Sequence, residues 1–247
     1  MANAKDIADV NPNISILIIG DSGTHKTFFL GTVPGLYVFD FDRGMAINRG
    51  KDIEYDTFKD APYGSNAYNP KKGIYQWGKA WPAFVNRINT IGADIDKGKW
   101  ERPLGFDSLT TMSNSARSYV VSSANRQPED GMRIQDWGME MALLETVMDQ
   151  LTTWPGIKIA TAHIQRDVNT VMESVEYLPL VTGKLAGKLA LYFDEVWYTK
   201  VAGKGEDKKF TLITESEGMY KQAKSRYGVP SGTEATWDAV KKYVVGE

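Results

Sequence analysis

Short runs of apolar residues that end abruptly in polar residues recur along this chain and predict buried β-strands. The first covers Ile14–Ile19, and the second covers residues 35–42, which read GLYVFDFD. Weaker runs end at Asp107 and at His163, and a further strand is expected over residues 208–216, after the turn GKGEDK. An apolar run bounded by turn residues is typical of a strand that is buried on both faces.

Three longer segments alternate with these strands and have the apolar spacing of amphipathic helices. They cover residues 74–92, 110–126 and 136–154. Pro82 marks the expected start of the first helix, and Pro155 marks the end of the third. Strands that alternate with helices predict an α/β fold with a mostly parallel central sheet flanked by helices.

The segment after the first strand has the order of a phosphate-binding loop. Its residues are Gly20, Asp21, Ser22, Gly23, Thr24, His25, Lys26 and Thr27. Backbone N–H groups and a helix N-terminus would surround the phosphates of a nucleotide. The pattern assigns Lys26 to the β- and γ-phosphates of ATP and the Thr27 hydroxyl to Mg²⁺. A plain strand-to-helix turn with a solvated lysine is the alternative.

His25 departs from this pattern, which has a glycine at its position. A left-handed or crowded backbone usually excludes a Cβ atom there. His25 therefore either weakens nucleotide affinity or covers the bound base or phosphates with its ring, and the sequence leaves both open.

Carboxylates end two of the predicted strands, at the sheet edge where sites form in this fold class. Asp107 fits the acid that positions Mg²⁺ through water, with a helix N-cap as the alternative. Asp40 and Asp42 end the neighbouring strand, on one face by two-residue alternation. We expect Asp42 to orient or deprotonate the attacking water because it lies further toward the edge. A solvated turn is the alternative for these two residues.

His163 is one of two histidines in the chain. A histidine at a strand end is more often structural than catalytic. His163 differs because its strand is expected in the middle of the site, where the ring could hydrogen-bond the γ-phosphate and report its loss to residues 164–170. No His and acid residues have the spacing of metal ligands, so Mg²⁺ is the one metal expected.

Composition narrows the class of protein further. The chain has 247 residues, of which 42% are hydrophobic, which suits one large α/β domain. Its net charge of −2 provides no global basic field for nucleic acid. It has no cysteine, which excludes disulfides and thiolate metal sites. Neither a signal peptide nor a membrane span is expected, so the predicted location is cytoplasmic.

Several of these motifs together give the chain a family resemblance. The order of phosphate loop, YVFDFDRGMA, FDSLT and IATAHIQR resembles the RecA/DnaB-type P-loop ATPase core. It is similar to phage RecA-like nucleotide-binding ATPases linked to single-strand annealing and recombination, which would place it in the host cytoplasm. The resemblance implies ATP and Mg²⁺ as cofactors, Asp42 as the catalytic carboxylate and His163 at the position of the γ-phosphate sensor.

AKSRYGVPSG resembles the Lys-x-Arg finger of DnaB-type helicases, which extends to the ATP of a neighbouring subunit. The resemblance assigns this role to Lys224 and Arg226, and it implies a homo-oligomer, a ring or a filament, with shared ATP sites. A solvated basic turn is the alternative. Single-stranded DNA is the expected partner, with Arg166, Lys184 and Lys188 as phosphate contacts. A glycine-hinged surface loop is the alternative for this segment.

These observations predict a flexible segment over residues 1–12, a RecA-like ATPase domain over 13–230 and a helical tail over 231–247. The expected function is ATP hydrolysis on single-stranded DNA in recombination or replication, with a single-stranded DNA-binding or recombination protein as a further partner. A nucleotide-dependent switch or assembly protein with slow turnover is the alternative. A small-molecule phosphotransferase is less favoured, because no acceptor-binding motif is evident.

Overall fold

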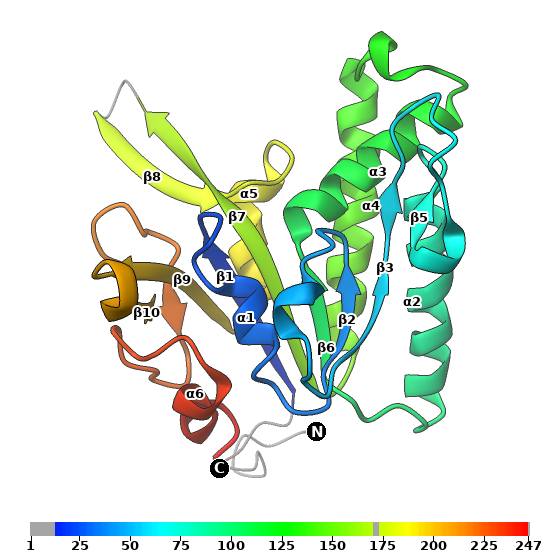
Figure 1. The fold of residues 1–247 in the computed structure, drawn as a ribbon. Helices are drawn as coiled ribbons and strands as arrows, with labels where there is room; N and C mark the ends of the chain where they lie inside the picture. The colour runs from blue at the N-terminus through cyan, green and yellow to red at the C-terminus, as the bar shows by residue number, and fades with distance from the viewer. Residues whose placement is uncertain (1–12, 170–172, 247) are drawn as a thin grey trace, which may run out of the picture.

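A mostly parallel sheet flanked by helices forms the core of the chain, as the sequence predicts (Figure 1). The structure is a computed structural model that describes residues 13–169 and 173–246, so the predicted flexible segment 1–12 lies outside the described residues. The strand order is β10-β9-β1-β7-β6-β2-β3. The pairs from β9 to β3 are parallel, and β10 is antiparallel to β9.

The elements have the following bounds. The strands of the main sheet are β1 (Ile14–Gly20), β2 (Tyr37–Asp40), β3 (Glu54–Thr57), β6 (Leu104–Asp107), β7 (Ile157–Asn169), β8 (Ser174–Pro179), β9 (Glu195–Ala202), β10 (Lys209–Ile213) and β11 (Lys224–Ser225). A small second sheet contains β4 (Lys59–Asp60) and β5 (Ile74–Tyr75). The helices are α1 (Lys26–Leu30), α2 (Ala80–Asp96), α3 (Leu109–Ser123), α4 (Ile134–Thr153), α5 (Leu185–Lys188) and α6 (Trp237–Val244).

Alternation along β1 explains why the sheet is covered on both sides. Leu17 and Ile19 belong to the apolar cluster that includes residues of α2, α3 and α4. Ile16 and Ile18 belong to a second cluster, with residues of α1 and α6. Because successive side chains of a strand point to opposite faces, both faces of β1 must be apolar. This explains the continuous apolar run from which the strand was predicted.

Two predicted boundaries are wrong. β2 ends at Asp40 rather than Asp42, so Asp42 lies in the following loop and does not share a strand face with Asp40. α2 begins at Ala80, two residues before Pro82. Proline is accepted in a first helical turn, where its missing N–H has no partner to lose. The helix after β6 has Ser108 as its N-cap, so the alternative role considered for Asp107, that of a helix cap, belongs to Ser108.

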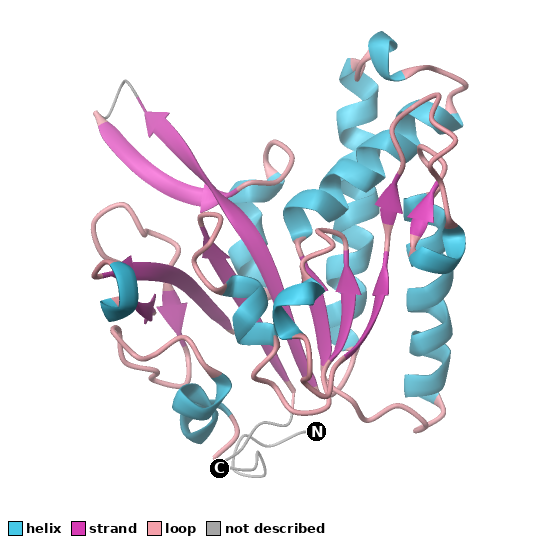
Figure 2. Cartoon of the chain, in the orientation of Figure 1, coloured by secondary structure: helices cyan, strands magenta, loops and turns pink. Residues whose placement is uncertain are grey.

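β7 also continues beyond His163, where the sequence predicted its end. Its parallel pairing with β1 stops at His163, opposite Gly20. The strand then runs to Asn169 and pairs antiparallel with β8. Figure 2 shows this hairpin projecting beyond the rest of the sheet. Arg166, Asp167 and Val168 of this extension are exposed, and Val168 is the one apolar residue between Gln165 and Asn169, so this part of the strand has the composition of a loop.

The segment predicted as a helical tail packs against the sheet. In α6, Trp237, Val240 and Val244 are buried in the same cluster as Ile16 and Ile18. The backbone N–H of Trp237 donates a hydrogen bond of 2.8 Å to the hydroxyl of Thr32, just after α1. The helix therefore helps to cover the face of the sheet that carries α1.

Candidate functional site

The predicted phosphate loop lies between β1 and α1, with its glycines where the backbone requires them. Gly23 has a φ of +76°. A Cβ atom on Gly20 would lie 1.9 Å from Oγ1 of Thr199 in β9. The Thr199 hydroxyl also donates a 2.6 Å hydrogen bond to the Thr24 hydroxyl. The loop is therefore packed directly against β9, which leaves no space for a side chain at position 20.

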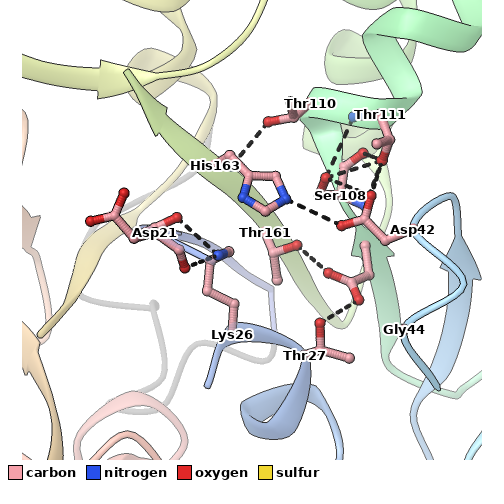
Figure 3. Close-up of polar contacts among 12 residues, drawn as sticks. Asp21, Lys26, Thr27, Asp42, Gly44, Ser108, Thr110, Thr111, Thr161 and His163 are labelled. Carbon is pink, nitrogen blue, oxygen red and sulfur yellow. Dashed lines mark hydrogen bonds and ion pairs between the residues drawn. The ribbon is translucent and has the colours of Figure 1, made fainter. Parts of the chain in front are cut away.

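Lys26 lies inside this loop (Figure 3). Its ammonium group donates hydrogen bonds to the carbonyls of Gly20, at 2.9 Å, and Asp21, at 2.7 Å. The side chain is buried, and this burial lowers the pKa of Lys26 although the nearby carboxylates of Asp107 and Asp42 oppose the shift. Two neutral carbonyls are weak partners for a buried cation, so a phosphate oxygen at this position would be a better one.

Thr27 and Asp107 are 80 residues apart in the sequence but are in contact in the structure. The Thr27 hydroxyl donates a 2.7 Å hydrogen bond to Oδ2 of Asp107, and the Thr161 hydroxyl donates to Oδ1 at 2.5 Å. Asp107 is 1% exposed. Burial raises its pKa, although these two hydrogen bonds oppose the rise. A hydroxyl and a carboxylate are the oxygen ligands that Mg²⁺ prefers, so the donor set fits the metal that the sequence predicts.

Asp42 and His163 form a pair next to Asp107, whose carbonyl accepts a 3.1 Å hydrogen bond from the N–H of Asp42. Nε2 of His163 lies 3.5 Å from Oδ2 of Asp42, and the two side chains are 31% and 21% exposed. Asp42 also accepts hydrogen bonds from the hydroxyls of Thr111 and Ser108. Burial raises the pKa of Asp42, but hydrogen bonds from His163, Thr111 and Ser108 outweigh burial and lower it overall. Asp42 is therefore ionised and open to solvent, as a base for water must be.

Asp40 has a different environment, although it is only two residues away. Its carboxylate accepts hydrogen bonds from the N–H of Gly44, at 3.2 Å, and from the hydroxyl of Thr57, at 3.3 Å. It is 1% exposed, and burial raises its pKa to about 6. A buried carboxyl held in this way is less suited than Asp42 to activate water.

Four hydroxyl residues of the site were not identified from the sequence: Ser108, Thr110, Thr111 and Thr161. Thr110 accepts a 2.9 Å hydrogen bond from the backbone N–H of His163. Thr161 lies two positions before His163 in β7, so the two-residue period of a strand places both on one face. That period was a usable signal for Thr161. The others depend on how α3 begins, which the sequence alone does not fix.

His25 occupies the left-handed conformation that glycine would favour, with a φ of +69°. Its ring stacks on Phe210 of β10, with 3.2 Å between ring centroids, and lies 4.7 Å from the ring of Phe28. Burial lowers the pKa of His25, and the charges of Lys208 and Lys51 lower it further. The ring therefore packs against the edge strand of the sheet and lines a cavity of about 560 Å³ beside the loop.

Lys224 and Arg226 lie near the amino-terminal ends of β9 and β1, whereas the phosphate loop follows the carboxyl end of β1. Ser225 pairs with Glu195 of β9, and Glu195 is level with Ile16, near the start of β1. The Lys224 ammonium donates to the carbonyl of Ala190 at 2.7 Å. Arg226 is 61% exposed and forms a 2.7 Å ion pair with Asp194. Neither residue is placed with the loop of its own chain.

The predicted nucleic-acid contacts are spread over two elements. Arg166 lies on the hairpin, opposite Tyr177. Lys184 is the exposed N-cap of α5, and Lys188 at the end of α5 lies 3.5 Å from a carboxylate oxygen of Glu145. The charge of Lys188 is therefore partly balanced within the chain.

The loop between β1 and α1, the Thr27–Asp107 contact and the mostly parallel sheet are together typical of a P-loop ATPase-like protein. Residues 12–227 match the model of an AAA domain family, AAA_24, and the chain belongs to this family. No curated protein matches the sequence.

Two solved structures are similar in fold at low sequence identity. One is a KaiC-like protein, PH0186, from Pyrococcus horikoshii OT3, with 13% identity and a TM-score of 0.44 over 83% of this chain and 80% of that one. The other is an ATPase from the type III secretion system of pathogenic bacteria, with 15% identity and a TM-score of 0.44 over 76% of this chain and 52% of that one.

Two features are absent from the described part of the chain. None of its helices is long and apolar enough to span a bilayer. It also contains no group of three or more His, Cys, Asp or Glu residues that could hold a metal ion.

Proposed function

We propose that this chain binds and hydrolyses Mg·ATP as a RecA-like ATPase. The observation that carries the proposal is the 2.7 Å hydrogen bond from Thr27 to Asp107, beside the buried ammonium of Lys26. Mg²⁺, when bound, would neutralise charge on the β- and γ-phosphates. Lys26 would exchange its two carbonyl partners for phosphate oxygens, and Asp107 would orient the metal.

Asp42 and His163 supply the groups needed at the γ-phosphate. The ionised carboxylate of Asp42 would accept a hydrogen bond from the attacking water and orient it. His163 lies within 3.5 Å of that carboxylate, so its ring can hydrogen-bond either Asp42 or a phosphate oxygen. We infer that His163 changes partner when the γ-phosphate is present, which makes it the sensor of that phosphate.

Arg226 supports the proposal that ATP sites are shared between chains. Arg226 lies near the amino-terminal end of β9, away from the phosphate loop of its own chain, and its side chain is mostly exposed. In a head-to-tail ring or filament, the surface of one subunit that carries Arg226 faces the surface of the next subunit that carries the phosphate loop. Lys224 and Arg226 would then complete the site of a neighbouring chain, where an arginine raises hydrolysis by several orders of magnitude.

Single-stranded DNA in recombination or replication, in a phage context, is the partner we propose for this ATPase. Arg166, Lys184 and Lys188 are its proposed contacts. A protein switch is the second candidate, and the hairpin favours it. Its described charged residues are Arg166, Asp167, Glu173 and Glu176, so acids outnumber bases. An acidic hairpin repels phosphates and suits a protein partner.

ATP hydrolysis with and without single-stranded DNA tests these proposals. Wild type would be compared with Lys26→Ala, Arg226→Ala and the control Lys97→Ala, an exposed lysine after α2. We expect the first two variants to lose at least about a hundredfold in rate, and the control to match wild type. No ATP binding by wild type would overturn the ATPase proposal. Binding and turnover that DNA leaves unchanged would favour the protein switch.

A further inference from the structure

A second cavity lies at the carboxyl ends of β2 and β3, beyond the phosphate loop. It has a volume of about 530 Å³. The charged and aromatic residues of its lining include Arg43, Tyr55, Asp56, Lys71, Lys72 and Tyr75. Neither the proposed ATP site nor the predicted DNA contacts include them.

The charges in this cavity are unequal. Asp56 is already engaged, because its Oδ2 accepts hydrogen bonds from the Tyr37 hydroxyl and from Nε of Arg87 at 2.8 Å. Arg43, Lys71 and Lys72 form no ion pair with any residue in the described part of the chain. Asp40 also lines the cavity, but it is 1% exposed and its carboxylate accepts hydrogen bonds from Gly44 and Thr57. Three cations therefore face a cavity whose two carboxylates are both engaged by other groups, which favours an anion.

The two lysines are held over the cavity by a fixed backbone. They belong to a single 3₁₀ turn, Pro70–Lys72, that ends at Gly73. Gly73 has a φ of +68°, and a Cβ atom on it would lie 2.2 Å from the carbonyl oxygen of Thr57 in β3. The carbonyl of Gly73 also accepts a 2.9 Å hydrogen bond from the N–H of Lys59. The turn is therefore fastened to the sheet, which fixes the backbone positions of its two lysines beside the cavity.

Aromatic rings complete the lining. Tyr55 is 51% exposed, and Tyr75 is partly buried. Cations for phosphate next to exposed aromatic rings for bases are the combination that binds nucleotides without sequence preference. The chemistry of the cavity thus suits a phosphate with an attached base better than an inorganic anion.

The cavity adjoins the proposed metal position through a single short segment. Arg43 and Met45 line the cavity. Between them, a Cβ atom on Gly44 would lie 3.4 Å from Oδ2 of Asp107 and 3.2 Å from Cγ2 of Thr27. One turn of backbone therefore has the cavity on one side and the Thr27–Asp107 pair on the other.

We propose that this cavity is a second phosphate site, which binds one nucleotide unit through Arg43, Lys71 and Lys72, with Tyr55 and Tyr75 beside the base. The unit is either a free mononucleotide or a residue of a single strand, since both offer the same phosphate and base. The proposal does not require hydrolysis at the phosphate loop.

Binding to a Lys26→Ala chain tests the proposal, because this variant removes the phosphate-loop lysine. Calorimetry would follow thymidine monophosphate, and fluorescence anisotropy would follow a labelled ten-residue oligothymidylate. Lys71→Glu/Lys72→Glu is then added to the same chain. The matched control adds Lys97→Glu/Lys99→Glu, with an equal charge change after α2. Circular dichroism and thermal unfolding verify that each variant is folded.

We expect the Lys71→Glu/Lys72→Glu pair to weaken binding by at least about tenfold and the control pair by less than about twofold. Binding of both probes identifies a free-nucleotide site, and binding of the oligonucleotide alone identifies a single-strand site. Failure of both probes, equal losses in the two charge-reversed chains, or equal affinity for unphosphorylated thymidine would overturn the proposal. Binding of Mg·ATP to wild type is measured separately, so the two proposals fail independently.

Discussion

His25 combines a backbone conformation suited to glycine with a ring packed between two phenylalanines. A non-glycine residue at a φ of +69° is destabilised by about 1 kcal/mol of backbone strain. Stacking on Phe210 stabilises the folded chain by about 1 kcal/mol. The stacking of the histidine ring therefore offsets the backbone strain at this position, which an alanine could not do.

Replacing His25 with glycine and with alanine separates these two terms. We expect His25→Gly to change the free energy of unfolding by less than about 1 kcal/mol, because the strain and the stacking are lost together. His25→Ala loses the stacking and keeps the strain, so it should be about 1 kcal/mol less stable than His25→Gly. Urea unfolding measures both. Equal stabilities for the two variants would show that the turn is not strained.

Asp40 gives the apo protein a specific pH dependence. Burial raises its pKa to about 6 in the folded chain, whereas an unfolded aspartate titrates near about 3.9. The folded state therefore binds more protons between these values, and its stability falls as the pH rises from about 4 to about 6, by about 3 kcal/mol. Other acids titrate nearby, so the effect is read as a difference from Asp40→Asn. That variant should lack this fall in urea unfolding from pH 4 to 7, and parallel curves would contradict the assignment.

At the scale of elements, the sequence specified the strands that are buried on both faces and failed where elements are exposed. The runs at Ile14–Ile19 and before Asp107 could be predicted because two layers of helix demand apolar side chains on both faces. The extension of β7 from Ile164 to Asn169 could not, since a hairpin in solvent has the composition of a loop. The pairing of Asp42 with His163 was also inaccessible, because it depends on where β2 stops.

A buried polar cluster joins three elements behind the site. Glu140 of α4 is fully buried and accepts hydrogen bonds from Ser113 of α3 and from Thr182, in the loop before α5. Arg117 of α3 adds a 3.4 Å contact to the same carboxylate and a 3.2 Å hydrogen bond to Thr182. The cluster ties the loop after the hairpin to both helices.

Removing Arg117 should loosen this junction. We expect Arg117→Met to lower the free energy of unfolding by about 2 kcal/mol, because the buried carboxylate of Glu140 then has only hydroxyl partners. Adding Glu140→Gln should recover part of that loss, since a neutral amide needs no cation. A double-mutant cycle by urea unfolding measures the coupling. Additive losses would show that the two side chains do not stabilise each other.

At the scale of the whole molecule, the phosphate loop and Arg226 lie toward opposite ends of the strands of one sheet. This separation has a consequence for mixed assemblies. A Lys26→Ala chain keeps its arginine, and an Arg226→Ala chain keeps its loop. We expect an equal mixture of the two to hydrolyse ATP at about a quarter of the wild-type rate, because random neighbours restore about one site in four. Steady-state phosphate release measures the rate. A mixture no faster than its separate components would exclude sharing of the arginine.

β7 belongs to two parts of the molecule at once. Its first half lies in the middle of the sheet and carries Thr161 and His163, and its second half forms the hairpin that stands clear of the sheet. An extended strand does not stretch, so Val168 stays about 17 Å from His163 along the same axis. His163 is the last residue of β7 that pairs with β1, opposite Gly20, so the histidine beside Asp42 stands at the junction of the two parts. A partner that binds the hairpin therefore contacts the same strand that carries this histidine.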